Sequence, residues 1–378
     1  MGMTATTPSV LSTRALNRAT LERQLLLRRA DMDAARAVEQ LVGLQTQVPT
    51  NHYTALWSRL DGFDPEDFSR RFGEREFVRL SMMRCTIHTV TARDALALRP
   101  LVQVVQDRTL KSAFGKRLAG VDLEQVVVRS RELLEEKPRS SGELGKILAE
   151  EWPGTQVQAL GMVARHLLPL VQVTPRGLWQ RGGLARHTTA GHWLGRQPVA
   201  EKDADLDAFV LRYLAAFGPA SVQDVQMWSG LTRLREVIER QRDQLAVFRD
   251  ESGTELYDLP DAPRPDADVP APARFLPEFD NVFIGHKDRA RIVGEGAQRH
   301  FWKGFEALPV FLSDGFLRGT WRIDADRKHT RAALEIKPFT SLPRAARAAL
   351  EAEGAALLAF HTPGAEHAVR WEPPYGEG

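Results

Sequence analysis

Two glutamines separated by one residue are the first feature of this sequence whose side chains could act together. Gln45 and Gln47 stand in the segment Leu44-Gln45-Thr46-Gln47-Val48-Pro49. On an α-helix, residues i and i+2 are about 200° apart, so the two carboxamides would face different ways. Pro49 favours extended geometry at Val48, and in an extended segment residues i and i+2 point to the same side. Because carboxamides donate and accept hydrogen bonds, such a pair can hold a water molecule; otherwise both are solvated residues at a helix end.

A basic pair lies in the segment Met83-Arg84-Cys85-Thr86-Ile87-His88-Thr89-Val90. Arg84 and His88 fall on one face of an extended chain, with Thr86 between them. We expect both residues at a DNA-contacting surface. For His88 a structural role with its ring nitrogens satisfied is the alternative, and the segment alone favours it.

Carboxylates occur in the segment Leu276-Pro277-Glu278-Phe279-Asp280-Asn281. Asp280 can activate a water molecule, or it can cap and anchor a turn. The second role is the commoner one for a carboxylate in a turn flanked by proline. Hydrolysis through Asp280 or Glu278 is therefore an alternative to chemistry at the glutamine pair.

Several classes of protein are excluded by what the sequence lacks. It has no Walker A motif, no G-x-S-x-G motif and no H-E-x-x-H motif. Its one cysteine, Cys85, excludes an internal disulfide and any zinc site with two or more thiolates. We expect neither a metal nor a cofactor. No run of 18 apolar residues and no secretory signal is present, so we expect a cytoplasmic, nucleoid-associated monomer.

The net charge of +2 is the sum of two unlike halves. Residues 1–200 carry 28 basic and 20 acidic side chains, a net of +8, whereas the remainder carries 23 and 29, a net of −6. The window from Trp152 to Ala200 contains no Asp or Glu. Such a stretch is typical of a surface that meets a polyanion, although a soluble arginine-rich face is the alternative. The candidate DNA-contacting residues in this window are Arg165, His166, Arg176, Trp179 and Arg181.

Hydrophobic periodicity and capping residues predict three helical groups, each followed by two strands. The first group has helices at 13–29, 33–48, 52–60 and 65–72 and strands at 77–83 and 86–90. The second has helices at 123–136, 143–152 and 156–170 and strands at 170–173 and 178–181. The third has helices at 206–217, 222–228 and 231–245 and strands at 245–249 and 255–259. This is the order of a winged helix-turn-helix motif. In the third group we expect Arg233 and Arg235 to contact DNA.

A β-rich unit follows a stiff, proline-rich linker. The stretch from Pro260 to Pro277 holds six prolines, which favour an extended spacer. The predicted strands lie at 282–284, 290–293, 310–313, 316–323, 333–336 and 356–361, with one helix at 344–353.

Over almost its whole length the chain resembles the AlkZ-like branch of the bacterial winged-helix DNA glycosylases. The resemblance rests on the segments at 44–49, 84–88 and 276–281, on Phe-Gly-Pro-Ala-Ser at 217–221 and on Gly-Thr-Trp at 319–321. It implies an α+β, mainly α fold in a C-shape around DNA. Three tandem winged helix-turn-helix motifs would occupy residues 1–120, 121–200 and 201–260, with the linker and a small β-barrel in residues 261–378.

The resemblance also assigns roles. The family's catalytic Gln-x-Gln motif, Gln-x-Asp in a sister branch, maps onto Gln45 and Gln47, with the polar Thr46 where the family usually has an aliphatic residue. It implies a monofunctional glycosylase that removes bulky N7-alkylated guanines from double-stranded DNA, unhooks interstrand crosslinks and serves self-resistance to a genotoxic compound. Because an N7-alkylated guanine is already a cationic leaving group, the glutamines would need only to stabilise the sugar and place a water molecule. The acid-free window would then be the recognition helix and wing of the second motif. The alternative is a non-enzymatic winged-helix regulator or lesion-binding shield.

Overall fold

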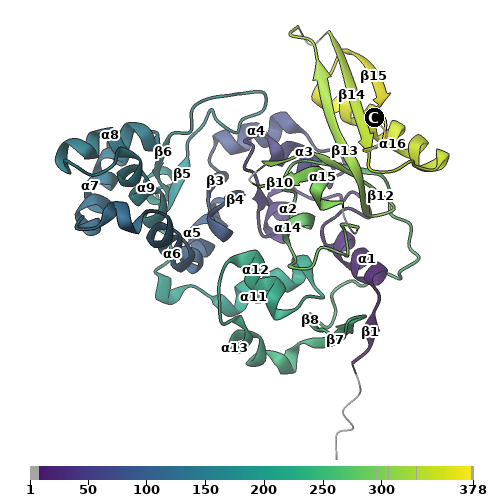
Figure 1. Ribbon diagram of the computed structural model, residues 1–378, viewed down its shortest axis with the longest axis horizontal. Helices are drawn as coiled ribbons and strands as arrows, with labels where there is room; N and C mark the ends of the chain where they lie inside the picture. The colour runs from purple at the N-terminus through teal and green to yellow at the C-terminus, as the bar shows by residue number, and fades with distance from the viewer. Residues whose placement is uncertain (1–7, 295–296, 305, 329, 376–378) are drawn as a thin grey trace, which may run out of the picture.

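The computed structural model describes residues 8–294, 297–304, 306–328 and 330–375, and its elements fall into four groups along the chain (Figure 1). The first group begins with helices whose N-terminal caps are side chains of the predicted type. Ser12 and Asp33 accept hydrogen bonds from the first turns of α1 and α2, which satisfies backbone donors that a helix leaves unpaired. The elements of this group are α1 (Thr13–Arg23), α2 (Ala34–Gln40), β2 (Leu44–Gln45), α3 (Asn51–Trp57), α4 (Pro65–Gly73), β3 (Phe77–Ser81) and β4 (Ile87–Thr91).

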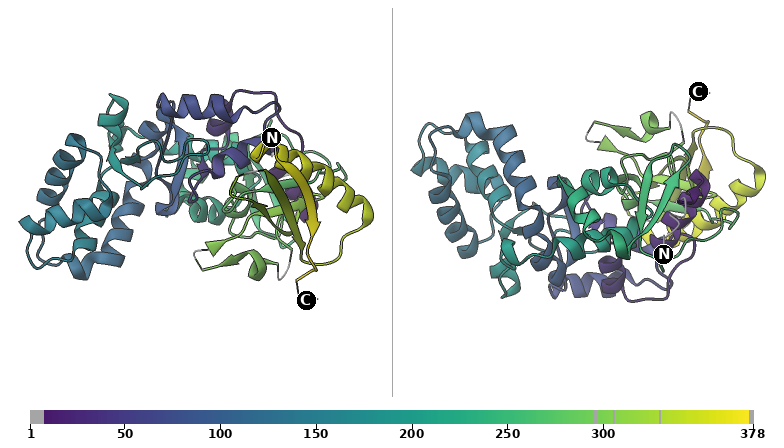
Figure 2. Two further views of the ribbon diagram at one scale, coloured as in Figure 1. Left: turned by 90° about the horizontal axis from the view of Figure 1, so that it is seen from above. Right: turned by 90° about the horizontal axis from the view of Figure 1, so that it is seen from below.

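The second group is a helical body at one end of the molecule, as both views of Figure 2 show. Its helix α7 has the predicted bounds, and α8 starts with a capping box formed by Ser140 and Glu143. The elements are α5 (Ala92–Leu98), α6 (Gln103–Phe114), α7 (Leu123–Glu136), α8 (Ser141–Glu151), α9 (Val157–Leu167), β5 (Leu170–Gln172), β6 (His187–Thr189) and α10 (Ala190–Leu194). Strand β5 pairs with β3, so the strands of the first two groups form one sheet in the order β2-β4-β3-β5-β6.

The predicted strand at 178–181 is wrong. Residues 174–186 contain neither helix nor strand, and the partner of β5 is β6 at His187–Thr189. Leu178 and Trp179 pack instead against the core of the first group. Removing these two apolar side chains from water stabilises the folded protein more than pairing them in an exposed strand would.

The third group shares its core with the first. It contains α11 (Leu206–Phe217), α12 (Val222–Ser229), α13 (Leu234–Glu239), β7 (Ala246–Asp250) and β8 (Glu255–Asp258), and β1 (Val10–Leu11) pairs with β7. Helix α13 is shorter than the predicted helix at 231–245. It starts after Arg233, whose backbone is left-handed with φ 62°, and it ends at Glu239, before a separate 3-10 turn at Arg242–Gln244. Leu80 and Met82 of the first hairpin lie in the same buried cluster as Tyr213 and Trp228. These groups are therefore not separate folding units.

The fourth group is an open sheet, so the predicted β-barrel is wrong. Its elements are β9 (Arg274–Leu276), α14 (Asn281–Ile284), α15 (Gln298–Phe301), β10 (Trp302–Lys303), β11 (Glu306–Ala307), β12 (Val310–Ser313), β13 (Phe316–Ala325), β14 (Arg331–Pro338), α16 (Arg344–His361) and β15 (Glu366–Trp371). The main sheet has the order β15-β14-β13-β12-β9, with β9 and β15 at its two edges. The sheet does not close into a barrel. Helix α16 covers one of its faces and returns the chain to β15, which pairs in parallel with β14. No helix of the described residues is long and apolar enough to cross a bilayer.

Three other predictions for this group are wrong. Residues 282–284 belong to the helix α14, residues 290–293 form turns, and residues 356–361 are the second half of α16. In α16 the buried residues Leu350, Leu357 and Leu358 recur at helical spacing and form one stripe. The apolar run that resembles a strand therefore continues the helix.

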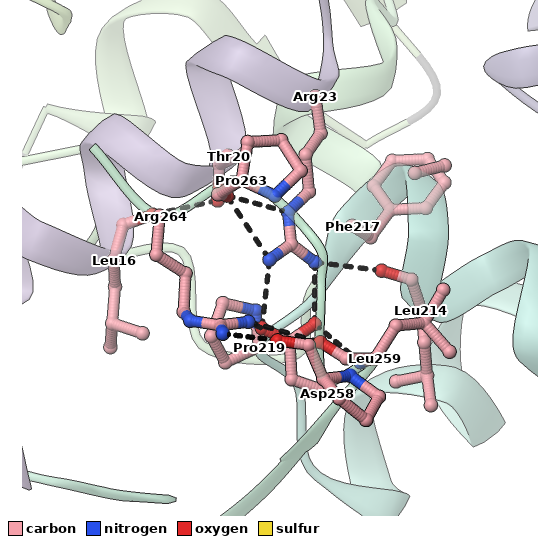
Figure 3. Close-up of polar contacts among 12 residues, drawn as sticks. Leu16, Thr20, Arg23, Leu214, Phe217, Pro219, Asp258, Leu259, Pro263 and Arg264 are labelled. Carbon is pink, nitrogen blue, oxygen red and sulfur yellow. Dashed lines mark hydrogen bonds and ion pairs between the residues drawn. The ribbon is translucent and has the colours of Figure 1, made fainter. Parts of the chain in front are cut away.

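Buried Arg23 of α1 holds the third group and the proline-rich linker together (Figure 3). The Arg23 guanidinium donates to both carboxylate oxygens of Asp258 at 2.6 and 2.7 Å, and the two side chains are 1% and 0% exposed. Arg264 donates to the same carboxylate at 2.6 Å. Arg18 and Arg14 donate to linker carbonyls, those of Val269 and Ala267. The predicted linker is thus a strap fixed along α1.

Candidate active site

The strand β2 brings the two glutamines to one side of the chain. Residues 44 and 45 pair with β4, and the Thr46 amide continues the pairing by donating to the Ile87 carbonyl at 2.8 Å. Thr46 is fully buried, and its hydroxyl lies 3.0 Å from that of Thr89. Because side chains alternate along an extended chain, Gln45 and Gln47 face the opposite way, into one cavity. The predicted helix at 33–48 is therefore too long, since α2 ends at Gln40, and the extended alternative, with both side chains on the same side, is the one that the structure has.

Both carboxamide oxygens are held by donors of the protein. Gln45 Oε1 accepts from Arg84 Nη2 at 2.6 Å, and the Thr86 hydroxyl can donate to it at 3.2 Å. Gln47 Oε1 accepts from the Ile87 amide at 3.2 Å. Within the described residues neither Nε2 group forms a hydrogen bond. Gln45 is buried and Gln47 is exposed at the mouth, so the pair presents N–H donors at two depths of the cavity.

Arg84 lies behind Gln45, in the turn between β3 and β4. Its backbone is left-handed with φ 54°, and its guanidinium also donates to the Trp228 carbonyl. Burial, together with the positive charge of Arg289, lowers the pKa of Arg84 to about 10. Arg84 therefore stays charged at neutral pH. The structure gives it a partner in the glutamine motif, which is a different contact from the predicted one with DNA.

The cavity has a volume of about 290 Å³ and is lined by three of the four groups of elements. Arg289 stacks over the Trp302 ring at 4.6 Å, and the Phe279 ring meets Trp302 edge-on at 5.4 Å. The lining residues are Gln45, Gln47, Arg84, Thr86, Met227, Phe279, Ile284, Arg289, Trp302 and Gly304. Sequence reasoning missed Met227, Ile284, Arg289 and Trp302 as site residues, because nothing in their local spacing marks them.

The segment 276–281 anchors the glutamine strand. Asp280 is buried, receives two hydrogen bonds from Arg59 at 2.7 and 2.8 Å, and caps α14. Asn281 accepts from the Gln45 amide at 3.4 Å and donates to the Gly43 carbonyl at 2.8 Å. Asp280 does not line the cavity, so these contacts support the anchoring role and disfavour water activation.

Glu278, the other carboxylate of this segment, is half-buried. Its pKa is raised because burial disfavours the charged form. Asn51 Nδ2 donates to the Glu278 backbone carbonyl at 2.9 Å. Glu278 is not among the residues that line the cavity.

Two histidines that we expected at the DNA surface lie inside the protein. His88 is 1% exposed, and its Nδ1 lies 3.1 Å from the Thr86 carbonyl. His166 is 5% exposed and lies 3.2 Å from the Gln106 side chain. Burial lowers their pKa values to about 3 and about 4, so both are neutral at pH 7. For these residues the structural interpretation fits the structure, and a DNA contact does not.

The acid-free window divides into exposed and internal residues. The Trp179 ring packs against Tyr53 at 4.7 Å and Phe360 at 5.1 Å, so the structure does not present it for stacking on DNA. The helix α9, which would be the recognition helix, packs against α6, α7 and α8, and Arg165 on it is half-buried. Arg176 is half-buried and donates to the Gly183 carbonyl at 2.6 Å. Of these residues Arg181 alone is exposed.

Arg233 and Arg235 are both exposed, at the start of α13. Arg235 lies 3.8 Å from Glu239, and Arg233 forms no ion pair with a described residue. Across the described residues, no group of three or more His, Cys, Asp or Glu side chains is placed to hold a metal ion.

Comparison with known proteins first gives a class, the DNA N-glycosylases. The family model "DNA glycosylase AlkZ-like" matches residues 38–360. The chain therefore belongs to the AlkZ-like family of DNA glycosylases and is an enzyme that acts on N-glycosyl bonds in DNA. The solved structure of the DNA glycosylase AlkZ from Streptomyces sahachiroi shares the fold, with a TM-score of 0.76 and 20% sequence identity. The match covers 96% of this chain and 100% of that chain. No curated protein matches.

Proposed function

We propose that this enzyme releases bulky N7-alkylated guanines from double-stranded DNA by attack of water at C1′, guided by Gln45 and Gln47. Monoadducts and interstrand crosslinks are both included, and self-resistance to a genotoxic compound is the proposed biological role. The observation that carries the proposal is the orientation of the two carboxamides. They enter one cavity while Arg84 and the Ile87 amide hold their oxygens.

The chemistry suits neutral side chains. An N7-alkylated guanine leaves as a neutral base from a cationic nucleotide, so departure needs little proton donation. Fixed dipoles then lower the barrier by stabilising charge at the sugar and by orienting the water, without reorganising during the reaction. The oxygen of Gln47 has one donor and therefore one lone pair left for a water proton. A carboxamide cannot form the imine that a lysine amine forms, so the product would be an abasic site without a strand break.

We further propose that the three helical groups are winged-helix motifs arranged in a C-shape around DNA, and that the enzyme acts as a monomer on DNA of the nucleoid. Arg181, Arg233 and Arg235 would contact phosphates, because they are exposed and such contacts position a protein on the duplex. Arg165 and Arg176 would contribute through the exposed parts of their side chains. Each exposed arginine should add about one unit to the salt dependence of binding.

An excision assay on duplexes with different N7-alkylguanines tests this function. Replacing both Gln45 and Gln47 by alanine should reduce base release by about 100-fold or more, scored as heat-labile abasic sites, with duplex affinity nearly unchanged. Gln125→Ala is the matched control, because Gln125 is exposed on α7 and far from the cavity in sequence.

Two outcomes would contradict the proposal. Base release that survives in the double variant would exclude the glutamine mechanism. An inactive Asp280→Asn variant that folds normally, together with an active Gln47→Ala variant, would instead assign the chemistry to Asp280.

A further inference from the structure

Two guanidinium groups face the glutamine cavity without a carboxylate. Arg84 donates to neutral oxygens, the carboxamide of Gln45 and the carbonyl of Trp228. Arg289 stacks over Trp302 at 4.6 Å. In the described part of the chain, no acidic side chain forms an ion pair with either arginine, and Arg289 forms no hydrogen bond. All five of its N–H donors are thus available to a ligand.

This arrangement differs from that of the buried arginines. Arg23 and Arg59 each donate twice to a buried carboxylate, Asp258 and Asp280 respectively. A buried arginine without a carboxylate, Arg79, donates to the oxygens of Gln172 and Thr46 instead. Because a charge away from water is costly when it is unpaired, the half-buried Arg289, which has neither kind of partner among the described residues, is the exception. At the glutamine cavity two like charges lie close enough that Arg289 lowers the pKa of Arg84. Burial also lowers the pKa of Arg289. The cavity is therefore an electropositive space to which the described residues supply no acidic partner.

We propose that Arg84 and Arg289 form an anion site, and that its ligand is the phosphodiester group next to the nucleotide being cleaved. The inference rests on the proposed function for its ligand, though not for the anion site itself. The alkylated base is a cation, and two guanidinium groups repel it. A phosphodiester is the anion that DNA carries at every nucleotide, and guanidinium groups bind phosphate oxygens with strong, charge-assisted hydrogen bonds.

The two arginines have different tasks in this site. Arg289 is a binding residue, and within the described part of the chain it forms no hydrogen bond or ion pair. Arg84 is also a positioning residue, because the same guanidinium holds Gln45 Oε1 at 2.6 Å. A phosphate on Arg84 would therefore fix the glutamine that lies deepest in the cavity when the scissile nucleotide is in place. A phosphodiester held here also brings negative charge near the sugar, where positive charge develops during cleavage.

Inorganic phosphate is the first probe, measured by calorimetry on the full chain without DNA. We expect wild type and Arg289→Lys to bind it, and Arg289→Gln to bind about tenfold more weakly, as for loss of a charge-assisted hydrogen bond. Arg93→Gln is the matched control, because Arg93 is 72% exposed on α5. Equal binding by wild type and Arg289→Gln would overturn the anion site.

The second experiment identifies the ligand by a double-mutant cycle. A neutral methylphosphonate replaces the phosphodiester on either side of an N7-alkylguanine, and the affinity of the duplex is measured. At one of the two positions we expect a loss of about tenfold for wild type and less than about twofold for Arg289→Gln, since the variant has already lost the contact. Equal losses for both proteins would exclude the flanking phosphodiester as the ligand.

These results separate the two proposals. Phosphate binding through Arg289 with no base release from any lesion would contradict the proposed substrate and leave the anion site standing. Normal base release by Arg289→Gln, with additive losses in the cycle, would remove the anion site and leave the glutamine mechanism intact.

Discussion

The first and third hairpins of the molecule have the same topology and opposite surroundings. Between β3 and β4 the turn contains Met82 and Met83, both fully buried against the third group. Between β7 and β8 the turn contains Glu251, which is exposed and whose carboxylate accepts from the Thr13 amide at 2.8 Å. The turn residues differ in hydrophobicity, and that difference decides which hairpin enters the core.

Neither turn presents basic side chains to solvent. Arg84, at the first turn, is committed to the glutamine strand, while the third turn carries the acidic pair Asp250 and Glu251. The first hairpin follows four helices and the third follows three, in the order expected of a wing, yet neither tip carries an exposed basic side chain. The topology of a hairpin alone therefore does not assign it a DNA-contacting role. The side chains at its tip decide whether it can contact DNA.

The largest effect should come from the buried turn. Met83→Ala should lower the free energy of unfolding by about 2–4 kcal/mol, because it leaves a cavity in the shared core. Ser252→Ala at the third turn should cost less than about 1 kcal/mol, since exposed polar contacts contribute little. Urea unfolding of the two variants measures the difference, and equal costs would break the comparison.

Substitution of Arg84 should lower kcat for base release, whereas substitution of an arginine in the third hairpin should not. Arg84→Met should lower kcat for base release by about 10- to 100-fold, because Gln45 loses the donor that orients it. The Arg84→Lys variant should keep part of the activity that Arg84→Met loses. Arg249→Met is the control, because Arg249 is exposed on β7. A change in KM alone for Arg84→Met would contradict the positioning role.

The two hairpins should lose stability in different ranges of acidic pH. Burial holds the pKa of His52 and His88 at about 3, below the value of 6.5 of an unperturbed histidine. The unfolded chain therefore binds more protons between pH 6.5 and 3, and the stability present above pH 6.5 falls as the pH drops. At pH 5.5 each histidine should cost about 1 kcal/mol.

The carboxylates at the third hairpin behave differently. Hydrogen bonds lower the pKa of Asp250, and the bond to Arg242 lowers that of Glu255, below their ordinary values of 3.8 and 4.5. Their contribution is present above these values and is lost only as the pH falls further. Hydrogen exchange at pH 5.5 should therefore show reduced protection in β4 and retained protection in β7. Equal loss in both strands would count against this assignment.

The smallest effect concerns DNA contact away from the hairpin tips. Arg181→Glu should weaken duplex binding by about tenfold or less and reduce its salt dependence, because Arg181 is exposed in the acid-free loop. The same charge reversal at Arg249 should leave the salt dependence unchanged. Binding titrations at several salt concentrations check both variants. If the dependence of duplex affinity on salt concentration is unchanged in Arg181→Glu, the loop does not belong to the DNA interface.

Local signals in the sequence predicted most of the helices, and they left the geometry of the glutamine pair open between an extended segment and a helix end. The bounds of α7 and α11 are those that periodicity gives, and α12 starts at the predicted residue, capped by Ser221. These features depend on neighbours within a few residues. The same reasoning failed at residues 282–284 and 356–361, where short apolar runs fit a strand and a buried helix equally well.

Features that depend on distant segments could not be predicted from local patterns. Arg289 reaches the cavity from a stretch more than 200 residues beyond the glutamines. Trp179 has the composition of a surface aromatic in a basic window, but Tyr53 and Phe360 cover it. The segment around Arg84 indicates a basic contact residue, but only the proximity of Gln45 and Trp228 in the fold shows that its guanidinium also holds the glutamine strand.

The buried pair between Arg23 and Asp258 also sets an order of events during synthesis. Asp258 follows Arg23 by 235 residues. A ribosome that adds about 5–20 residues per second needs roughly 10 to 50 seconds to synthesise this stretch. Through that interval the Arg23 guanidinium lacks the carboxylate with which it pairs in the folded protein. The N-terminal helix is therefore among the first elements synthesised but gains its buried ion pair only after about two thirds of the chain has been made.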